Sequence, residues 1–442
     1  MTATDERADR LAIDDLRNAW VVLSTEERVL GFGLLSSDQA EEFFLSLPGT
    51  DAAELLAALP AQDHRRWMRL LAPDDAADLI QGASEELRGP FLDLLDESTR
   101  REVSALLAYA EDRAGGLMNP RYARLRPDMN VDEAIAYLRR QTREHLETIY
   151  YAYVVDPDQR LLGVVSFREL FSSPPGIRVR DVMRTDVVTV DEQMDQEAVG
   201  RVFAEHDLIA IPVVDSARRI KGIVTVDDIV DVVREEATED IQKIGGTQAL
   251  DAPYLEVGVL GMVRKRAIWL TVLFVGQLLT ATAMAYFEDE IARAVVLALF
   301  IPLVISSGGN SGSQASTLVI RAMAMGEVRL RDWALVLRRE LAAGLLLGLL
   351  LGVIGLLRVL LWPGRVSAFG EHFFLIGMTV GVSLVWIVMW GAVAGAMLPF
   401  VLRRLGFDPA SASAPFVSTL VDVTGLVIYF SVATLLLTGT LL

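Results

Sequence analysis

Asp422 is the residue whose type and position most clearly indicate chemistry, because it lies inside the apolar stretch Phe416–Leu442. It is the only carboxylate in the interior of the membrane spans predicted below. An ionisable side chain at the centre of a bilayer costs about 2.5 kcal/mol or more, and its usual role there is to meet an ion or a proton. The sequence therefore points to transport. A structural aspartate bonded to a neighbouring helix, or a proton relay, is the alternative.

A second group of polar residues lies at membrane depth, in the stretch Ser306–Thr317. Backbone that unwinds at this depth must face protein or a water-filled cavity, because lipid satisfies no free N–H or C=O group. Helix packing through Gly308 and Gly312 is the alternative, but it leaves Asn310 and Gln314 unexplained. These polar side chains favour a pore lining.

Asn310 and Asp422 fall at similar predicted depths. At 1.5 Å per residue, Asn310 lies ~16 Å and Asp422 ~9 Å from the cytoplasmic side of the membrane. Mg²⁺ gives up its waters reluctantly and usually meets only one or two carboxylates. One aspartate per subunit is compatible with this coordination preference of Mg²⁺. In a two-fold dimer the two Asp422 side chains would face each other.

Five apolar stretches each cover the ~20 helical residues that cross a bilayer core about 30 Å thick. They are Ala267–Phe287, Ile291–Val319, Leu341–Trp362, Phe373–Phe400 and Phe416–Leu442. Lysine and arginine gather in alternate loops, which predicts a cytoplasmic N-terminus. These basic groups are Arg264 to Arg266, Arg321 to Arg339, and Arg403 with Arg404. An odd number of spans then places the C-terminus outside.

Composition divides the chain into an acidic half and an apolar half. The net charge is −18; residues 1–250 carry 48 acidic and 28 basic residues, net −20, and residues 251–442 carry 11 and 13, net +2. Such an acidic part repels nucleic acid and concentrates cations. Cysteine is absent and the four histidines are scattered, so a bound metal must be held by oxygen. The N-terminus has no signal-peptide pattern, so this half is expected to stay in the cytoplasm.

The acidic half shows two kinds of organisation. Residues 1–113 read as short helices separated by proline and glycine turns, which predicts a small helical superhelix. Residues 116–235 contain a duplication: Gly116-Leu-Met is echoed by Asp181-Val-Met, and Gly163-Val-Val-Ser by Gly222-Ile-Val-Thr. Each copy alternates strand-like and helical runs.

The duplicated region resembles a tandem pair of CBS domains, regulatory modules that often bind adenine nucleotides. The resemblance implies nucleotide contacts at Asp181, Thr225 and Asp228, the last two within the pattern Gly222-x-x-Thr225-x-x-Asp228. Leu208 departs from the aromatic residue that some family members carry beside the pocket. ATP is therefore an open expectation, which equilibrium dialysis would decide.

An acidic helix is predicted to follow the duplicated region, from Asp227 to Asp240. Like charges four residues apart, such as Glu235 and Glu239, destabilise an isolated helix by ~0.2–0.5 kcal/mol. A bound cation would reverse that sign. A merely solvated acidic helix is the alternative.

The whole order resembles the MgtE-type magnesium channels. The resemblance rests on Gly308-Gly309-Asn310-Ser-Gly-Ser-Gln314, on Pro415 to Phe430 around Asp422, and on Glu236-Ala-Thr-Glu239-Asp240. It implies a multidomain fold: an all-α helical domain (1–113), two α/β CBS domains (114–177 and 178–235), an acidic connecting helix (228–262) and an all-α membrane domain of five helices (263–442). It also implies a homodimer in a prokaryotic inner membrane.

The same resemblance implies where Mg²⁺ binds. The pore site would comprise Asp422, Asn310 and Gly309. Further ions would bridge cytoplasmic carboxylates in a sensor set: Asp74, Asp195, Glu197, Asp207, Asp228, Asp231, Glu236, Glu239, Asp240 and Asp408. Among neighbouring carboxylates, Asp75 and Asp78 compete with Asp74 for this assignment.

The resulting hypothesis is a magnesium-selective channel that internal Mg²⁺ closes by bridging acidic domains that otherwise repel each other. A proton- or sodium-coupled exchanger, and a membrane-anchored Mg²⁺ or nucleotide sensor without conduction, are the alternatives. An enzyme is not expected, because one membrane carboxylate without a partner histidine, lysine or second acid forms no catalytic group.

Overall fold

A computed structural model describes residues 13–141, 148, 150–250, 254–255 and 257–441. The chain divides into two compact units, Met1–Glu236 and Ala237–Leu442, and each is described by itself.

The first unit begins with short helices that pack around an apolar core, which confirms the all-helical prediction for this part. Serine caps start two of them: Ser24 and Ser36 each accept a backbone hydrogen bond while the third residue of the helix bonds back. Buried Phe43, Phe44 and Leu79 lie in the core. The helices are α1 (Ile13–Ala19), α2 (Thr25–Leu34), α3 (Ser37–Leu45), α4 (Gly49–Ala58), α5 (Ala61–Met68), α6 (Pro73–Gly82), α7 (Glu85–Leu92) and α8 (Glu97–Leu106).

Two small sheets of identical topology follow, as the duplication predicts. In each, a short strand pairs in parallel with the first strand of an antiparallel hairpin, and each hairpin carries an irregularity at the matching place, Val154/Val155 and Val213/Val214. The elements are α9 (Ala114–Leu117), β1 (Arg124–Leu125), α10 (Val131–Gln141), β2 (Tyr151–Val155), β3 (Leu161–Ser166), α11 (Phe167–Ser172), α12 (Val179–Val182), β4 (Val190–Asp191), α13 (Gln196–His206), β5 (Ala210–Val214) and β6 (Ile220–Thr225).

The two copies are tied together by crossed backbone contacts. Asn119, before the first sheet, pairs with Ile223 on β6, and Arg184, before the second, pairs with Val164 on β3. A Cβ on Gly222 would lie 2.7 Å from the Asn119 carbonyl oxygen, and Gly163 has the same relation to Arg184. Both glycines of the repeated motif are therefore explained by close backbone approach.

One apolar core joins the N-terminal helices to elements of the second CBS copy, and the first copy has a core of its own. Phe203 on α13 and Ile229 belong to the same buried cluster as Leu79 and Leu106 of the N-terminal helices. Helix α14 (Val226–Ile244) starts directly after β6 and contains the predicted acidic helix.

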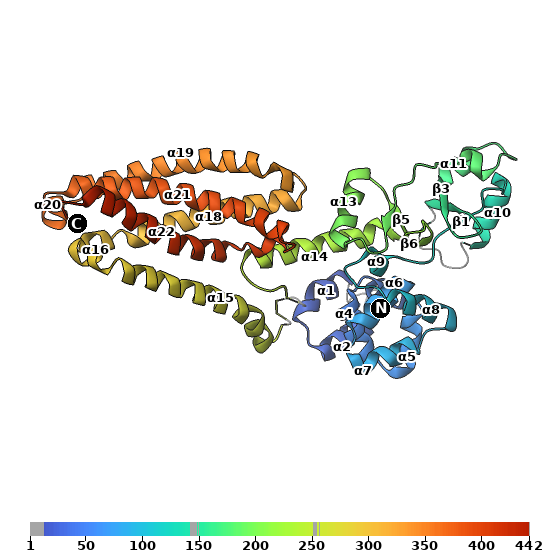
Figure 1. The fold of residues 1–442 in the computed structure, drawn as a ribbon. Coiled ribbons are helices and arrows are strands. Elements are labelled where there is room, and N and C mark those ends of the chain that lie inside the picture. Colours follow the sequence, from blue (N-terminus) through green and yellow to red (C-terminus); the bar gives the residue numbers. More distant parts are fainter. Residues whose placement is uncertain (1–12, 142–147, 149, 251–253, 256, 442) are drawn as a thin grey trace, which may run out of the picture. The chain divides into compact units, whose positions relative to one another are not determined.

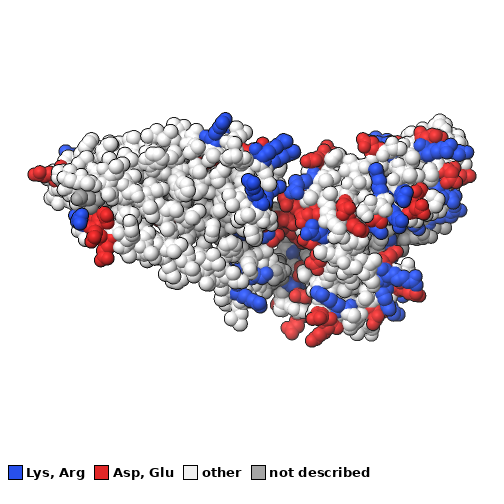
Figure 2. Space-filling model, viewed as in Figure 1, with Lys and Arg blue, Asp and Glu red and all other residues white. Residues whose placement is uncertain are grey.

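The second unit has five helices long and apolar enough to cross a membrane, among the residues that the structure describes, which confirms the predicted number. Helices α19 and α21 run side by side, α18 and α22 complete the bundle, and α15 contacts it chiefly through α22 (Figure 1). Charged side chains gather at the ends of these helices and leave an uncharged band between (Figure 2). The elements are α15 (Val259–Tyr286), α16 (Glu288–Arg293), α17 (Val295–Ala298), α18 (Ile301–Ala324), α19 (Trp333–Leu360), α20 (Arg365–Phe369), α21 (Phe373–Arg404) and α22 (Ala414–Leu437).

Candidate ion pathway and cation sites

Asp422 lies near the middle of α22, partly exposed within the single chain. The amide of Gln277 on α15 acts on its carboxylate as a side-chain hydrogen-bond partner. One turn earlier, Ser418 packs against Gly309 of α18, where an added Cβ would lie 2.7 Å from the serine hydroxyl. The predicted pore residues Asp422 and Gly309 are therefore within about one helical turn of each other.

Helix α18 is continuous through the polar stretch Ser306–Thr317, so the expected unwinding does not occur. Glycine explains the close packing instead: Gly308 contacts Ile387 and Val421, and Gly312 contacts Val417. Small residues let helix backbones approach closely inside membranes.

Three serines of this stretch, Ser311, Ser313 and Ser316, donate to backbone carbonyl groups on neighbouring segments. Ser311 donates to the Val388 carbonyl at 3.2 Å, and Ser316 donates to the Ala412 carbonyl at 2.8 Å. Asn310 and Gln314, in contrast, are exposed on the open side of α18. The packing interpretation holds for the glycines and for these three serines, and the two amides are left on an uncovered face.

Tyr429 lies seven residues after Asp422, on the same side of α22, but it has a structural role. Its side chain is fully buried, and its hydroxyl donates to the Leu297 carbonyl at 2.9 Å. Tyr429 therefore does not extend the polar face that Ser418 and Asp422 form on α22.

An acidic cluster lies in the first unit where α6 and α14 approach each other. We define it as Asp75, Asp78, Glu111, Asp228 and Glu235. Burial raises the pKa of Asp78 to about 7, with further contributions from its acidic neighbours Asp75 and Asp228. Burial also raises the pKa of Asp228 to about 6, although the Thr225 hydroxyl donates to it at 2.6 Å. The negative charge of this cluster is poorly compensated, which is the condition that attracts a cation.

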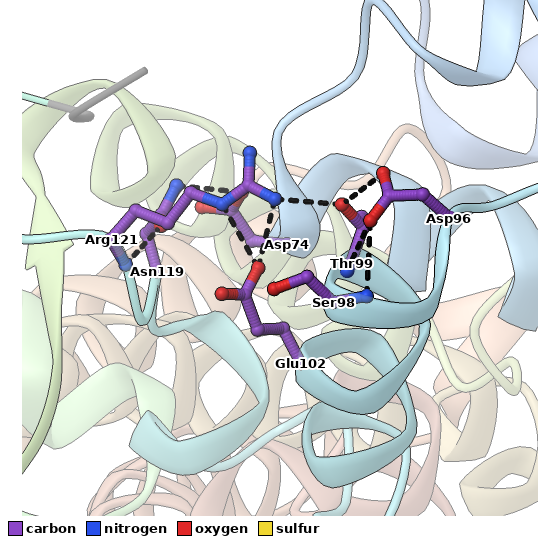
Figure 3. A network of polar contacts seen from close by, with 7 residues as sticks. All are labelled: Asp74, Asp96, Ser98, Thr99, Glu102, Asn119 and Arg121. Carbon is purple, nitrogen blue, oxygen red and sulfur yellow. Dashed lines mark hydrogen bonds and ion pairs between the residues drawn. The ribbon is translucent and has the colours of Figure 1, made fainter. Parts of the chain in front are cut away.

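Asp74 points elsewhere. It is 7% exposed and accepts a hydrogen bond from the Asn119 amide at 3.0 Å, within a polar network that includes Arg121 (Figure 3). Asp75 and Asp78 are the carboxylates of α6 that interact electrostatically with α14.

In the second unit, a lysine joins two carboxylates of the predicted sensor set. The Lys243 ammonium group contacts Glu239, one turn earlier on α14, and Asp408 at 2.7 Å. Burial opposes its charge, but the hydrogen bonds to Asp408 and Glu239 outweigh that cost and raise its pKa. The family resemblance implies Glu239 and Asp408 as Mg²⁺ ligands, and it does not indicate the lysine that joins them here.

The remaining predicted sensor residues lie at separate places. Asp195 caps α13, Glu197 pairs with Arg201 at 2.6 Å, and Asp207 ends α13 in a left-handed conformation. Asp231 lies 3.7 Å from Arg234, and Glu236 accepts a hydrogen bond from Gln196 at 2.7 Å. Asp240 also has a partner. Within the described ranges, no three acidic or histidine side chains converge as a metal-binding group.

The predicted nucleotide region contains a small cavity of about 80 Å³, lined by Leu208, Tyr151 and Arg184 among others. Ligand pockets for drug-sized molecules usually measure ~300–1,000 Å³. Thr225 and Asp228 bond to each other, and Asp181 is exposed beside Arg180. Binding of a nucleotide there would require the cavity to widen.

Comparison with known proteins decides the family. Residues 301–432 match the model of the MgtE divalent cation transporter domain, residues 11–112 the MgtE intracellular N domain, and residues 114–175 and 179–235 the CBS domain. The chain is 43% identical to the magnesium transporter MgtE of Thermus thermophilus, over 98% of this chain and 95% of that protein. The chain belongs to the MgtE family.

Two further relatives extend this comparison. The magnesium transporter MgtE of Bacillus subtilis is 33% identical over 83% of this chain and 79% of that protein. A crystal structure of the cytosolic domain of the Mg²⁺ channel MgtE in complex with ATP is 42% identical, covering 51% of this chain and 92% of that chain, with a TM-score of 0.48.

Close glycine packing in this MgtE chain leads to a first prediction. A methyl group at Gly395 on α21 would collide with the backbone of Gly312 on α18, which has no flexible end to move aside. Overpacking of this kind typically costs 1–3 kcal/mol. We expect Gly395→Ala to lower the melting temperature and the yield of monodisperse protein in detergent. The control is Gly261→Ala on α15, where only ordinary contact is present; equal behaviour of the two variants would contradict the packing argument.

The raised pKa of Asp78 leads to a second prediction, on pH dependence. The folded state binds the Asp78 proton more tightly than the unfolded state, so in EDTA the stability of the first unit should fall as pH rises from about 4 through about 7. Asp78 is exposed by relative surface area although protein atoms crowd around it, so screening by solvent moderates the effect. Hydrogen exchange of α6 in the full-length protein, corrected for the intrinsic pH effect, measures this loss.

Asp78→Asn should remove much of that pH dependence, and the exposed Glu86→Gln should retain it. An unchanged pH profile in Asp78→Asn would show that the group does not titrate in this range.

Proposed function

We propose that this chain is a magnesium channel of a prokaryotic inner membrane that internal Mg²⁺ closes. The observation that carries the proposal is Asp422, a carboxylate in the interior of a membrane helix, beside the Gly309–Ser418 contact and an uncovered polar face of α18. Both curated relatives described above are named magnesium transporters. No catalytic role is proposed for any residue.

We also propose that the chain forms a homodimer. In the single chain α15 has no buried residue, and Asn310, Gln314 and the edge of Asp422 remain open. A two-fold axis near that face would bring two Asp422 carboxylates toward one pathway. Two carboxylates attract a hydrated dication without stripping all its waters, so the ion can also leave.

The orientation of the chain in the membrane is proposed from its charges. Arginines lie at the end of α18, at the start of α19 and at the end of α21. In contrast, Glu288, Asp289 and Glu290 lie in α16, which follows the C-terminal end of α15. Excess positive charge marks the cytoplasmic side. The cytoplasmic N-terminus and the external C-terminus follow from this rule.

Closure by internal Mg²⁺ is proposed at two places. The acidic cluster would bind a hydrated ion between α6 and α14, with Asp75 and Asp78 as the N-terminal members in place of Asp74. The second place is the contact of α14 with Asp408, near the cytoplasmic end of the membrane helices. Ligands shift a conformational equilibrium only by binding one state better, and bridged carboxylates provide that difference.

Lys243 gives a third prediction. Its ammonium group already neutralises Glu239 and Asp408, so it holds α14 to this site without a metal ion. We expect Lys243→Met to raise several-fold the internal Mg²⁺ concentration needed for half-closure, because Mg²⁺ must then overcome the repulsion between two carboxylates that the ammonium group no longer neutralises. Single-channel recording measures the open probability, with Lys265→Met as a charge-matched control. Identical open probability in the two variants would contradict this role.

ATP binding is a separate proposal, which the CBS resemblance alone suggests. Equilibrium dialysis of the full-length protein against ATP tests it. The 80 Å³ cavity and Leu208 favour weak or no binding.

Current through a bilayer containing purified protein tests the channel proposal. The reversal potential should move by about 30 mV per tenfold Mg²⁺ gradient, as for any ion of two charges. A pH or Na⁺ gradient should leave it unchanged. A reversal potential that follows protons or Na⁺ would identify an exchanger. Absence of both current and uptake would identify a sensor without conduction.

A further inference from the structure

A basic cavity of about 860 Å³ lies in the first unit, apart from the acidic cluster and from the cavity beside Leu208. Its walls come from the end of α5, the start of α8, the segment before β1, the end of α10 and β6. This volume falls in the usual range for small-molecule sites. Helical N-terminal elements and CBS elements therefore share the walls of one cavity.

The charge of this cavity is opposite to that of its surroundings. The basic lining residues are Arg69, Arg121, Arg124 and Lys221, and the acidic ones are Asp96 and Glu102, which leaves a net charge of +2. The first 250 residues carry a net charge of −20. The negative charge of the surrounding domain repels anions, so an anion can be held there only where basic side chains gather. This cavity is such a place.

Two of the four basic side chains already form ion pairs within the protein. Arg121 pairs with Glu102 at 2.9 Å and donates to Thr99 at 2.8 Å (Figure 3), and Lys221 lies 3.3 Å from Asp215. The two other cations, Arg69 and Arg124, form no ion pair with any residue that the structure describes.

Asp96 does not compensate them. Its carboxylate caps α8, accepting hydrogen bonds from the backbone of Ser98 and Thr99 and from the Thr99 hydroxyl (Figure 3). These bonds lower its pKa and hold its charge on its own helix. Arg69 and Arg124 thus remain available to a ligand.

Gln141 supplies a second, independent indication of a ligand. Its side chain is 9% exposed and lines the cavity, yet its Oε1 has no hydrogen-bond partner among the described residues. A buried acceptor without a donor costs about 1–3 kcal/mol. Tyr122, also on the wall, is buried, and burial raises its pKa to about 12, so its hydroxyl stays protonated. A ligand that brings a hydroxyl donor would satisfy Gln141.

We propose that the basic cavity binds a small phosphate monoester that also carries hydroxyl groups. Arg69 and Arg124 would bind the phosphate, since the planar guanidinium group matches phosphate oxygens in pairs. Gln141 would accept a hydrogen bond from a ligand hydroxyl. Because both the helical and the CBS elements contribute, the bound ligand stabilises their contact. This site takes no part in Mg²⁺ permeation, so the ligand proposal does not depend on the proposed channel function.

Glucose 6-phosphate is a suitable probe, because it has a phosphate and hydroxyls, lacks a base that would stack in the CBS cavity, and binds Mg²⁺ weakly. Equilibrium dialysis uses the full-length protein in nanodiscs with millimolar Mg²⁺, with glucose and inorganic phosphate as parallel arms. We expect saturable binding of glucose 6-phosphate, weaker binding of phosphate and none of glucose.

Arg69→Ala with Arg124→Ala should weaken that binding at least about tenfold, since charge-assisted hydrogen bonds are lost. Gln141→Leu should weaken the binding of glucose 6-phosphate but leave the binding of inorganic phosphate unchanged. Arg126→Ala, an exposed arginine just after β1, is the matched control and should bind as the unchanged protein does. Absence of saturation by about 10 mM, or equal affinity in the double variant and the control, would overturn the proposal.

Discussion

Asp422→Asn is expected to reduce Mg²⁺ current at least about tenfold and to weaken the preference for divalent over monovalent cations. Asparagine has nearly the same shape and still bonds to Gln277, so α22 should keep its packing on α18 and α15. What is lost is the negative charge that compensates a dication in a poorly solvated pathway. In a dimer, two charges are lost together. A tenfold fall corresponds to about 1.4 kcal/mol, which is small for such a change.

Purified variants in planar bilayers, with zero internal Mg²⁺ so that closure does not intervene, give the measurement. The matched control is Asp289→Asn, an exposed aspartate on α16. Uptake by a Mg²⁺-auxotrophic strain gives an independent readout. Unchanged flux and unchanged ion preference in Asp422→Asn would remove the basis of the permeation model.

Neutralising the acidic cluster is expected to leave current flowing at millimolar internal Mg²⁺. The triple variant Asp75→Asn, Asp78→Asn, Asp228→Asn removes three carboxylates that interact electrostatically between α6 and α14. Without them a hydrated ion has little to bridge, so the closed state loses its binding advantage. We expect the Mg²⁺ concentration for half-closure to rise at least about tenfold.

A charge-matched control separates bridging from overall charge. The variant Asp15→Asn, Asp38→Asn, Glu86→Gln removes the same three charges from exposed positions of the N-terminal helices. If repulsion across the whole domain governs closure, the two triple variants should behave alike. If repulsion within the cluster governs it, the cluster variant should be closed even without Mg²⁺; either result would contradict the bridging proposal.

Much of the fold follows from local patterns. Membrane-length apolar stretches predict five spans because each must bury ~20 residues, whatever its neighbours are. The duplicated CBS motifs predict two equivalent sheets, and the structure pairs Asn119 with Ile223 and Arg184 with Val164 in matching ways. The spacing of Gly163 and Gly222 within the motif was visible, but the backbone contact that requires glycine there was not.

The sites depend more on contacts between distant segments. Residues 306–317 looked able to unwind because they are polar, and they remain helical because Ser311 and Ser316 find carbonyl partners about 77 and 96 residues away. Tyr429 lies two helical turns after Asp422 on the same side of α22, yet its hydroxyl bonds to the Leu297 carbonyl inside the bundle.

By itself, the sequence determined the family resemblance, the number of spans, the acidic character of residues 1–250 and the one carboxylate in a predicted span interior. These properties depend on composition and on spacing within a segment. Only the tertiary structure decided that Asp74 bonds to Asn119 while Asp75 and Asp78 interact with α14, that Lys243 joins Glu239 to Asp408, and that Arg69 and Arg124 share a cavity with Gln141. Adjacent carboxylates are chemically equivalent along the chain, and they differ only through the groups that folding brings to each.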